Sequence, residues 1–329
     1  MQYGTIVHYI LERFFGEYTK EEYLSLEEDK FQKIVCAYLT EYAVKYFGEE
    51  QLESNSFTYR LKTILDNVMY LMKHIMEELS KSEFFVADCE LKIGEDIPSY
   101  TIVLPDGHKI AVCGSVDRVD IMQRADITYL RIIDYKTGTK QFKLSDILYG
   151  INLQMLLYLH SIEVSGGDKY GEIVPAGILY MPATVPYISS DSLKSIDKLP
   201  DELNKKLKMN GLLLKDTEII HGMDKTDVAT YIPVKIKAGE PVSSTSLATL
   251  AEFGKIFKKV DMLIAEMGKN IYNGNIEAKP LKGGHDSCEY CPYDSVCAYR
   301  QSNPITCFSV DNKTVIEEIT NEINGKEEE

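Results

Sequence analysis

Residues 114–138 read GSVDRVDIMQRADITYLRIIDYKTG and contain two β-rich runs on either side of a short polar turn. In a β-strand alternate side chains share a face, so Asp134 and Lys136 project together while Tyr135 points the other way. The isoleucines that precede Asp134 predict a strand buried inside a sheet. A carboxylate and an ammonium group at the end of such a strand are costly unless a partner offsets their charge.

A metal site explains this pair of charged residues best. Mg²⁺ or Mn²⁺ binds carboxylate oxygens, backbone carbonyls and water, and Asp117 on the preceding run supplies a second carboxylate. Lys136 would then lie beside the attacking water and offset charge on a phosphate. The alternative is a surface ion pair between Asp134 and Lys136, which a lone Asp-x-Lys triplet would favour. Asp117 in the neighbouring run favours the metal site.

Other polar side chains have both a functional and a structural interpretation. Gln154 and Tyr158 are four residues apart in a helical pattern and share a face. Gln154 could orient water or contact a phosphate and Tyr158 could stack or form a hydrogen bond, although an isolated tyrosine there more often packs in the core. His8 lies among apolar residues and becomes a ligand only if its helix packs beside the carboxylates. Glu90, on the first β-rich run, pairs with Lys136 or with another basic neighbour.

The order of periodic segments predicts a mixed α/β fold in one contiguous domain. Helical spacing dominates the beginning, β-rich runs follow, and a long helix with a buried face returns near the end. In chain order we expect a helical part (1–82), a core of strands and a helix (83–183), an irregular excursion with a hairpin around 226–236 (184–240), a long helix and a cysteine-rich end (246–300), and an acidic tail with a short amphipathic helix (313–329).

The composition limits the classes of function. The chain has 329 residues with 36 Lys and Arg against 51 Asp and Glu, a formal charge of −15. This acidity argues against a protein that coats nucleic acid by bulk charge, but not against an enzyme with one local basic track and carboxylates gathered around a metal. The N-terminal sequence lacks the features of a signal peptide, and no apolar run approaches the roughly 18 residues of a membrane span. We expect a cytoplasmic protein with no membrane contact.

Three of the seven cysteines, Cys288, Cys291 and Cys297, crowd into CEYCPYDSVC. An odd number of cysteines in a long chain does not indicate a disulfide framework. The short spacing indicates a metal or cluster site, and a zinc site that includes His285 is one candidate. Three ordinary reduced cysteines are the remaining interpretation.

The ordered set Gly4-x-x-x-His8, GSVDRVD, IIDYKTG and QMLLY resembles the RecB-type nuclease branch of the PD-(D/E)XK superfamily, and in particular the nuclease domains of AddAB-type helicase–nucleases. The resemblance implies one restriction-endonuclease-like domain over residues 1–312, with a central mixed sheet flanked by helices. It implies metal-dependent hydrolysis of DNA in double-strand break processing and recombinational repair. The residues that it implicates are His8, Asp117, Asp134 and the Tyr135 carbonyl as metal ligands, Lys136 as the catalytic lysine, and Gln154 and Tyr158 in the motif that follows.

The resemblance also implies a [4Fe–4S] cluster, which needs four thiolates. Cys288, Cys291 and Cys297 match three of them, and the family's first ligand lies in a Cys-Pro motif ahead of the helix that carries His8. Only three residues precede Gly4 here, so we expect a fragment without that ligand. Cys36 or Cys307 could replace it, although no spacing argument supports either residue.

The family implies DNA and a helicase subunit as partners. The sequence has no G-x-x-x-x-G-K-[ST] phosphate loop, so ATP hydrolysis would come from another part or a partner. A freestanding RecB- or Cas4-like exonuclease and a nuclease-fold DNA-binding module without catalysis are the alternatives. The lysines that we expect to contact DNA are Lys140, Lys143, Lys194, Lys198, Lys205, Lys206, Lys208, Lys215, Lys255, Lys258 and Lys259.

Overall fold

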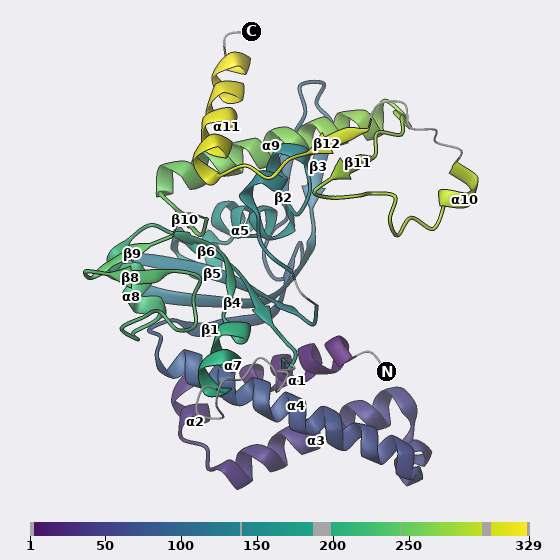
Figure 1. Ribbon diagram of the computed structural model, residues 1–329, viewed down its shortest axis with the longest axis vertical. Helices are drawn as coiled ribbons and strands as arrows, with labels where there is room; N and C mark the ends of the chain where they lie inside the picture. The colour runs from purple at the N-terminus through teal and green to yellow at the C-terminus, as the bar shows by residue number, and fades with distance from the viewer. Residues whose placement is uncertain (1–2, 139, 187–198, 244, 298–303, 328–329) are drawn as a thin grey trace.

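The two β-rich runs of residues 114–138 form neighbouring antiparallel strands at the centre of a six-stranded mixed sheet in the computed structural model (Figure 1). The structure describes residues 3–138, 140–186, 199–243, 245–297 and 304–327. In spatial order the strands are β1 (Phe85–Ile93), β4 (Gly114–Arg124), β5 (Ile127–Lys136), β6 (Glu172–Pro182), β7 (Asn210–Leu214) and β10 (Leu247–Ala248).

Strand directions change across the sheet. Strands β1, β4 and β5 are antiparallel neighbours, β5 and β6 are parallel, β6 and β7 are antiparallel, and β7 and β10 are parallel. The carboxyl ends of β5 and β6 therefore lie at the same edge of the sheet as the first residue of β7. The register places Asp134 beside Tyr180 of β6, and Tyr180 beside Asn210 of β7.

The N-terminal part of the chain forms a helical layer below the sheet in the view of Figure 1. Each long helix is amphipathic, and its apolar side joins the common core. Helix α1 buries Ile6, Ile10 and Phe14, and it packs on β1 and α3. The elements are α1 (Tyr3–Glu17), α2 (Lys20–Leu24), α3 (Glu28–Phe47), the 3₁₀ helix η1 (Glu49–Glu53) and α4 (Asn55–Ser80).

Helices α5, α9 and α11 lie above the sheet in Figure 1. Helix α5 (Gln154–Ser165) packs on β6 and on α9 (Leu250–Tyr272), and α11 (Asn312–Glu327) packs on α9. A capping box between Thr249 and Glu252 begins α9, because each side chain satisfies a backbone N–H group of the first turn. Lys259, one of the lysines expected to contact DNA, is 5% exposed and pairs with Glu322 of α11 at 2.5 Å. That prediction was wrong for Lys259.

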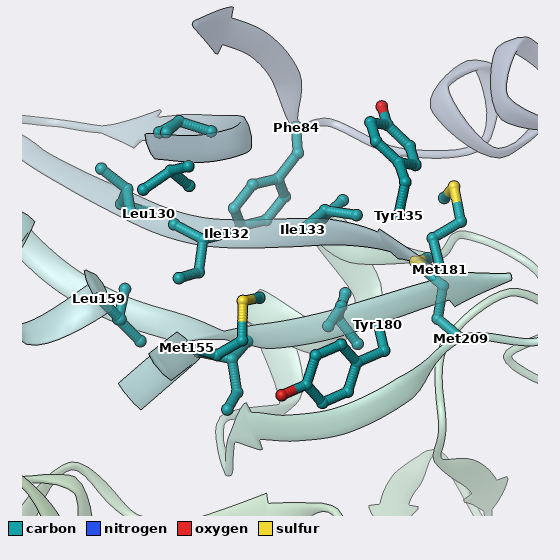
Figure 2. Close-up of a cluster of buried hydrophobic side chains, with 14 of the residues drawn as sticks. Phe84, Leu130, Ile132, Ile133, Tyr135, Met155, Leu159, Tyr180, Met181 and Met209 are labelled. Atoms are coloured by element: carbon teal, nitrogen blue, oxygen red, sulfur yellow. The ribbon is translucent and has the colours of Figure 1, made fainter. Parts of the chain in front are cut away.

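The sheet is buried on both faces, as Figure 2 shows around β5. Phe84, Ile133 and Tyr135 lie on the side of the helical layer, whereas Ile132 lies toward Met155 and Leu159 of α5. Helices on both faces explain why β5 is apolar along most of its length and does not alternate simply between apolar and polar residues. The charged residues of this strand are therefore exceptions that need partners.

The region predicted as an excursion contains a core strand. Strand β7 joins the main sheet between β6 and β10, and its residues Gly211–Leu214 are buried. Around it lie α7 (Leu199–Leu207), α8 (Thr217–Met223), β8 (Lys235–Lys237) and β9 (Glu240–Val242). The hairpin predicted around 226–236 lies later, between β8 and β9, where Ala238 and Gly239 turn the chain with φ of 51° and 84°. Positive φ at both positions is typical of a type I′ turn.

Smaller elements complete the described chain. The helix expected within residues 83–183 is α5, and it is preceded by the separate 3₁₀ helix η2 (Leu144–Tyr149), because Gly150 and Asn152 between them have positive φ. None of the helices in the described ranges combines the length and apolar character needed to span a membrane. The remaining elements are α6 (Gly167–Tyr170), α10 (Asp294–Cys297), β2 (Tyr100–Val103), β3 (Lys109–Val112), β11 (Leu281–Gly283) and β12 (Ile305–Cys307).

Candidate active site

Asp134 and Lys136 project from the same face at the carboxyl end of β5, as the alternation of the strand predicts. Oδ2 of Asp134 lies 2.5 Å from Nζ of Lys136, and Asp134 is 5% exposed. The same oxygen makes no hydrogen bond of good geometry to any described residue. A buried carboxylate oxygen with only an ion-pair contact has room in its coordination for a cation.

Asp117 of β4 is anchored by the neighbouring strand. Its Oδ2 accepts a 2.8 Å hydrogen bond from the backbone N–H of Tyr135. Burial raises the pKa of Asp117 to about 6, and the negative charge of Asp134 acts in the same direction, whereas a charged His8 and the Tyr135 N–H oppose the increase. A carboxyl group with this pKa holds a proton more readily than usual, and a bound cation would favour its ionised form.

His8 reaches the carboxylates from α1. The helix that carries His8 therefore packs beside the strand carboxylates, which was the condition for His8 to be a metal ligand. Its Nδ1 lies 3.1 Å from Oε1 of Glu90 and 3.7 Å from Oδ1 of Asp117. The hydrogen bond to Glu90 raises the pKa of His8, while burial acts against it and the charge of Asp117 adds to the increase. Glu90 therefore pairs with His8, and not with Lys136.

Glu90 is the site residue that the sequence left undecided. Its carboxylate also accepts a 2.9 Å hydrogen bond from the Ser115 hydroxyl, so both oxygens have partners. Its backbone has φ of 50°, a left-handed conformation that is uncommon for a non-glycine residue inside a strand. Such conformations persist where the surrounding structure demands them, often at functional sites. No local pattern in the sequence CELKI predicts that Glu90 belongs to the site.

Potential ligand atoms of His8, Glu90 and Asp117 all lie within 4.8 Å of one another. Within the described ranges no other group of three or more His, Cys, Asp or Glu residues meets this criterion. The donor set of carboxylate oxygens and one imidazole nitrogen fits Mg²⁺ or Mn²⁺. Asp134 lies outside this group and is paired with Lys136, so the structure brings together two of the three predicted ligand side chains, His8 and Asp117, and adds Glu90.

Gln154 and Tyr158 lie on α5 as predicted, and each has a different environment. Gln154 is the first residue of the helix and is exposed. Tyr158 is half-buried, and its ring lies against the start of β4, where a Cβ atom added to Gly114 would come within 2.2 Å of the tyrosine oxygen. Glycine at position 114 therefore makes room for this ring. No described hydrogen bond links Gln154 or Tyr158 to the carboxylates.

A buried ionic network lies next to the two aspartates in sequence. Arg118 bonds Asp120 through its Nε at 2.6 Å, and Arg131 bonds Glu78 through its Nη2 at 2.6 Å. All four side chains are at most 1% exposed. The pairing of two arginines with two carboxylates is what makes their burial tolerable. It also connects α4 to β4 and β5, the strands that carry Asp117 and Asp134.

The described residues of the cysteine-rich end do not bring three potential metal ligands close together. Cys288 and Cys291 are half-buried, Cys297 is exposed at the end of α10, and Cys307 is buried in β12. Cys36 is exposed on α3. In the described part of the chain, no three of these cysteines and His285 have their ligand atoms within 4.8 Å of one another. The iron–sulfur cluster and the zinc site stay predictions.

Comparisons with known proteins agree with this architecture. A family model described as the PD-(D/E)XK nuclease superfamily matches residues 1–298. A protein of Thermoanaerobacter sp. (strain X514), named as one subunit of an ATP-dependent helicase/deoxyribonuclease, is 38% identical over 246 residues, which are 73% of this chain and 21% of that protein. A protein of the same name from Alkaliphilus oremlandii (strain OhILAs) is 33% identical over 336 residues, 97% of this chain and 29% of the relative. The chain thus spans less than a third of the length of these relatives.

Proposed function

Because this chain belongs to the PD-(D/E)XK nuclease superfamily, we propose that it hydrolyses DNA phosphodiester bonds with a divalent metal ion at the ends of β4 and β5. Family membership and the six-stranded mixed sheet confirm the predicted α/β fold and the nuclease resemblance. The observation that carries the proposal is the convergence of His8, Glu90 and Asp117 beside the Asp134–Lys136 pair.

In this proposal the metal ligands come from four elements, α1, β1, β4 and β5. His8 of α1, Glu90 of β1 and Asp117 of β4 supply the group of closely spaced donor atoms. We assign Asp134 and the Tyr135 carbonyl to the same centre, because both lie at the end of β5 beside Asp117. Mg²⁺ or Mn²⁺ bound there would lower the pKa of a water molecule and offset negative charge on the phosphate.

Lys136 performs the electrostatic part of the reaction. Its ammonium group is held 2.5 Å from Asp134, so its position is set before substrate arrives. A fixed positive charge beside the phosphate stabilises the charge that develops on the phosphoryl oxygens, and its N–H groups can orient the attacking water. We propose that Gln154, exposed at the start of α5, lies near the phosphate. Tyr158 of the same helix packs against Gly114 at the start of β4 and supports this end of the site.

We also propose that the chain works with a helicase subunit in the processing of DNA breaks. The name of the relatives describes one subunit of a helicase and deoxyribonuclease, and this sequence has no phosphate loop of its own. That name gives less support to a freestanding exonuclease. The presence of Asp117, Asp134 and Lys136 gives less support to a binding module without catalysis.

A cysteine-ligated cluster is the second cofactor in the proposal, with Cys288, Cys291 and Cys297 as three ligands. An iron–sulfur cluster would give visible absorption and about four iron atoms per chain, whereas a zinc site with His285 would give neither. Metal analysis of the purified protein, together with a Cys288→Ser variant, separates these two possibilities. Loss of iron in the variant supports the cluster, and zinc in its place contradicts it.

The nuclease proposal is tested by the degradation of linear DNA in Mg²⁺, in Mn²⁺ and in EDTA. We expect cleavage with either metal, no cleavage in EDTA, and loss of cleavage in Asp134→Asn and in Lys136→Ala. The matched controls are Asp106→Asn and Lys109→Ala in the exposed β2–β3 hairpin, which should retain activity. Full activity in either active-site variant contradicts the proposed site. DNA binding without cleavage under every divalent metal would favour the non-catalytic module.

A further inference from the structure

A groove of about 1020 Å³ runs along the β10 edge of the sheet. Its lining elements β8, β9 and β10 lie at the left of the view in Figure 1. Its walls come from parts of the chain that are distant in sequence. They are the end of α7, the β8–β9 hairpin, strand β10 and the first turns of α9 and α11. The groove is separate from the site formed by His8, Glu90 and Asp117, which lies at the other end of the strand order, at β1 and β4.

The groove is strongly basic in a protein that is acidic overall. Among the described residues of its lining Glu252 is the one carboxylate, whereas the whole chain has a formal charge of −15. This local reversal of sign is what a polyanion would require from an acidic protein. The lysines of the lining are Lys205, Lys208, Lys215, Lys235, Lys237 and Lys313.

Three of these lysines make no ion pair with a carboxylate in the described part of the chain. Among the described residues, no Asp or Glu oxygen lies within 4.0 Å of the ammonium groups of Lys215, Lys235 or Lys237. Elsewhere in the fold comparable lysines are paired, as Lys169 is with Asp88 at 2.5 Å. Positive charges grouped without counterions favour an anionic ligand, because binding then releases the ions condensed on that ligand.

Another lysine of the groove is fixed in place. Nζ of Lys208 donates to the carbonyl oxygens of Ala229 at 2.7 Å and Val234 at 3.1 Å. These two bonds leave one of its three N–H groups available and hold the ammonium group at the wall. Such a preorganised donor loses less conformational freedom on binding than a flexible surface lysine.

The groove connects to the proposed active site through the register of the sheet. Asp134, Tyr180 and Asn210 are neighbours across β5, β6 and β7, so Asn210 lies two strand spacings, about 10 Å, from Asp134. The preceding residue, Met209, lines the groove. The Asn210 side chain donates to the Lys140 carbonyl and accepts from the Phe142 N–H, which fixes residues 140–142 just ahead of Leu144, another lining residue.

We propose that this groove binds one strand of DNA that extends from the Asp134–Lys136 site, with its phosphates on the lysines and its sugars and bases against the apolar wall. The inference rests on the proposed nuclease function. A volume near 1000 Å³ is at the upper end of pockets for drug-sized ligands, so it accommodates a few nucleotides of a single strand and not a duplex. The described lining consists mainly of lysines and apolar side chains, which can contact the phosphates and sugars common to every DNA sequence, so we expect binding to be independent of sequence.

The test compares two triple variants of the 329-residue chain. The first carries Lys215→Glu, Lys235→Glu and Lys237→Glu, and the matched control carries Lys30→Glu, Lys33→Glu and Lys62→Glu on the exposed sides of α3 and α4. Binding of a fluorescent single-stranded oligonucleotide is measured by anisotropy in EDTA between about 50 and 200 mM salt. We expect the groove variant to bind the oligonucleotide at least about tenfold more weakly than the wild type does. The slope of log K against log salt concentration should be smaller in magnitude by about 2, because three phosphate contacts are lost. The control changes affinity less than about threefold.

A small substrate separates the groove from the active site. Hydrolysis of bis(p-nitrophenyl) phosphate in Mn²⁺ needs only the metal site, so the groove variant should retain it while losing affinity for the oligonucleotide. Unchanged oligonucleotide affinity overturns the groove assignment even if the nuclease proposal holds. Reduced affinity in a protein that cleaves neither substrate supports the groove and contradicts the nuclease proposal. A version with glutamine at the same three positions shows whether charge reversal has simply disturbed folding.

The competing occupant is an acidic protein segment. Competition with polyglutamate of the same charge as the oligonucleotide distinguishes the two. If polyglutamate displaces the oligonucleotide at a concentration equal to that of the oligonucleotide, the result contradicts a DNA site. If polyglutamate displaces it only at a concentration at least about tenfold higher, the result supports a DNA site.

Discussion

The backbone N–H of Tyr135 donates a 2.8 Å hydrogen bond to Oδ2 of Asp117. Strand β5 therefore holds the carboxylate of its neighbour β4 through the residue that separates Asp134 from Lys136. The side chain of Tyr135 points into the opposite face, where it packs at an edge-on angle to the His8 ring with centroids 5.7 Å apart. One residue thus contacts two of the proposed ligands and orders both sides of the strand end.

Replacement of Glu90 tests whether it belongs to the metal site. We expect Glu90→Gln to weaken Mn²⁺ binding about tenfold or more, because a neutral amide is a poorer ligand and also a weaker partner for His8. Isothermal titration of the metal-free protein measures the affinity. Glu95→Gln, in the exposed turn after β1, is the control and should bind as the wild type does. Equal affinities for Glu90→Gln and wild type would remove Glu90 from the site.

The close approach of Tyr158 to Gly114 predicts a coupled pair of substitutions. Gly114→Ala puts a methyl group within 2.2 Å of the tyrosine oxygen and 2.6 Å of the ring, so it should lower the free energy of unfolding by about 1–3 kcal/mol through overpacking. The same substitution should cost much less in a Tyr158→Ala background. Urea unfolding of the four proteins gives the coupling energy. An equal cost in both backgrounds would show that another contact is responsible.

The buried ionic network predicts a large effect for the removal of one arginine. Arg131→Met leaves Glu78 and Asp120 buried with one arginine between them and should destabilise the protein by about 3–5 kcal/mol. Arg124→Met removes a pair with Glu83 in which the arginine is half exposed, and it should cost less than about 1 kcal/mol. Thermal and urea unfolding compare the two variants. Similar losses of stability would contradict a special role for the network.

His160 predicts a pH dependence that is independent of the metal site. It lies between α5 and α9, 3.0 Å from Glu163 and 3.3 Å from Asp261, and its ring stacks on Phe257. Burial alone would lower the pKa of His160, but the two carboxylates outweigh it and raise the pKa to about 9.

The folded protein therefore holds the proton more tightly than the unfolded chain, whose histidine has a pKa near 6.5. The stabilisation is fully present below about pH 6.5 and is lost as the pH rises to about 9, a total of roughly 3 kcal/mol. The free energy of unfolding at about pH 6 and pH 9.5, for wild type and His160→Gln, measures it. The variant should lose less stability over this range, and His221→Gln should behave as the wild type does. Parallel curves for wild type and His160→Gln would exclude this contribution.

Local patterns predicted much of the centre of the molecule. The alternation in residues 132–136 placed Asp134 and Lys136 on one face, because the direction of a side chain in a strand depends only on the residue's position along it. The apolar stripe of the long helix expected from residue 246 predicted α9 (Leu250–Tyr272) for the same kind of reason. The short apolar run of β7 carries no such period, since a strand that is buried on both faces does not alternate.

The tertiary structure decided which distant residues meet. His8, Glu90 and Asp117 converge only because α1 packs on β1 and β1 pairs with β4, and Lys259 is buried because α11 returns to cover α9. The basic groove likewise gathers lysines from α7, β8 and α11. The sequence alone therefore determined the chemical groups and the faces on which they lie. Their distances, and hence the composition of the site, depend on long-range packing that no local periodicity encodes.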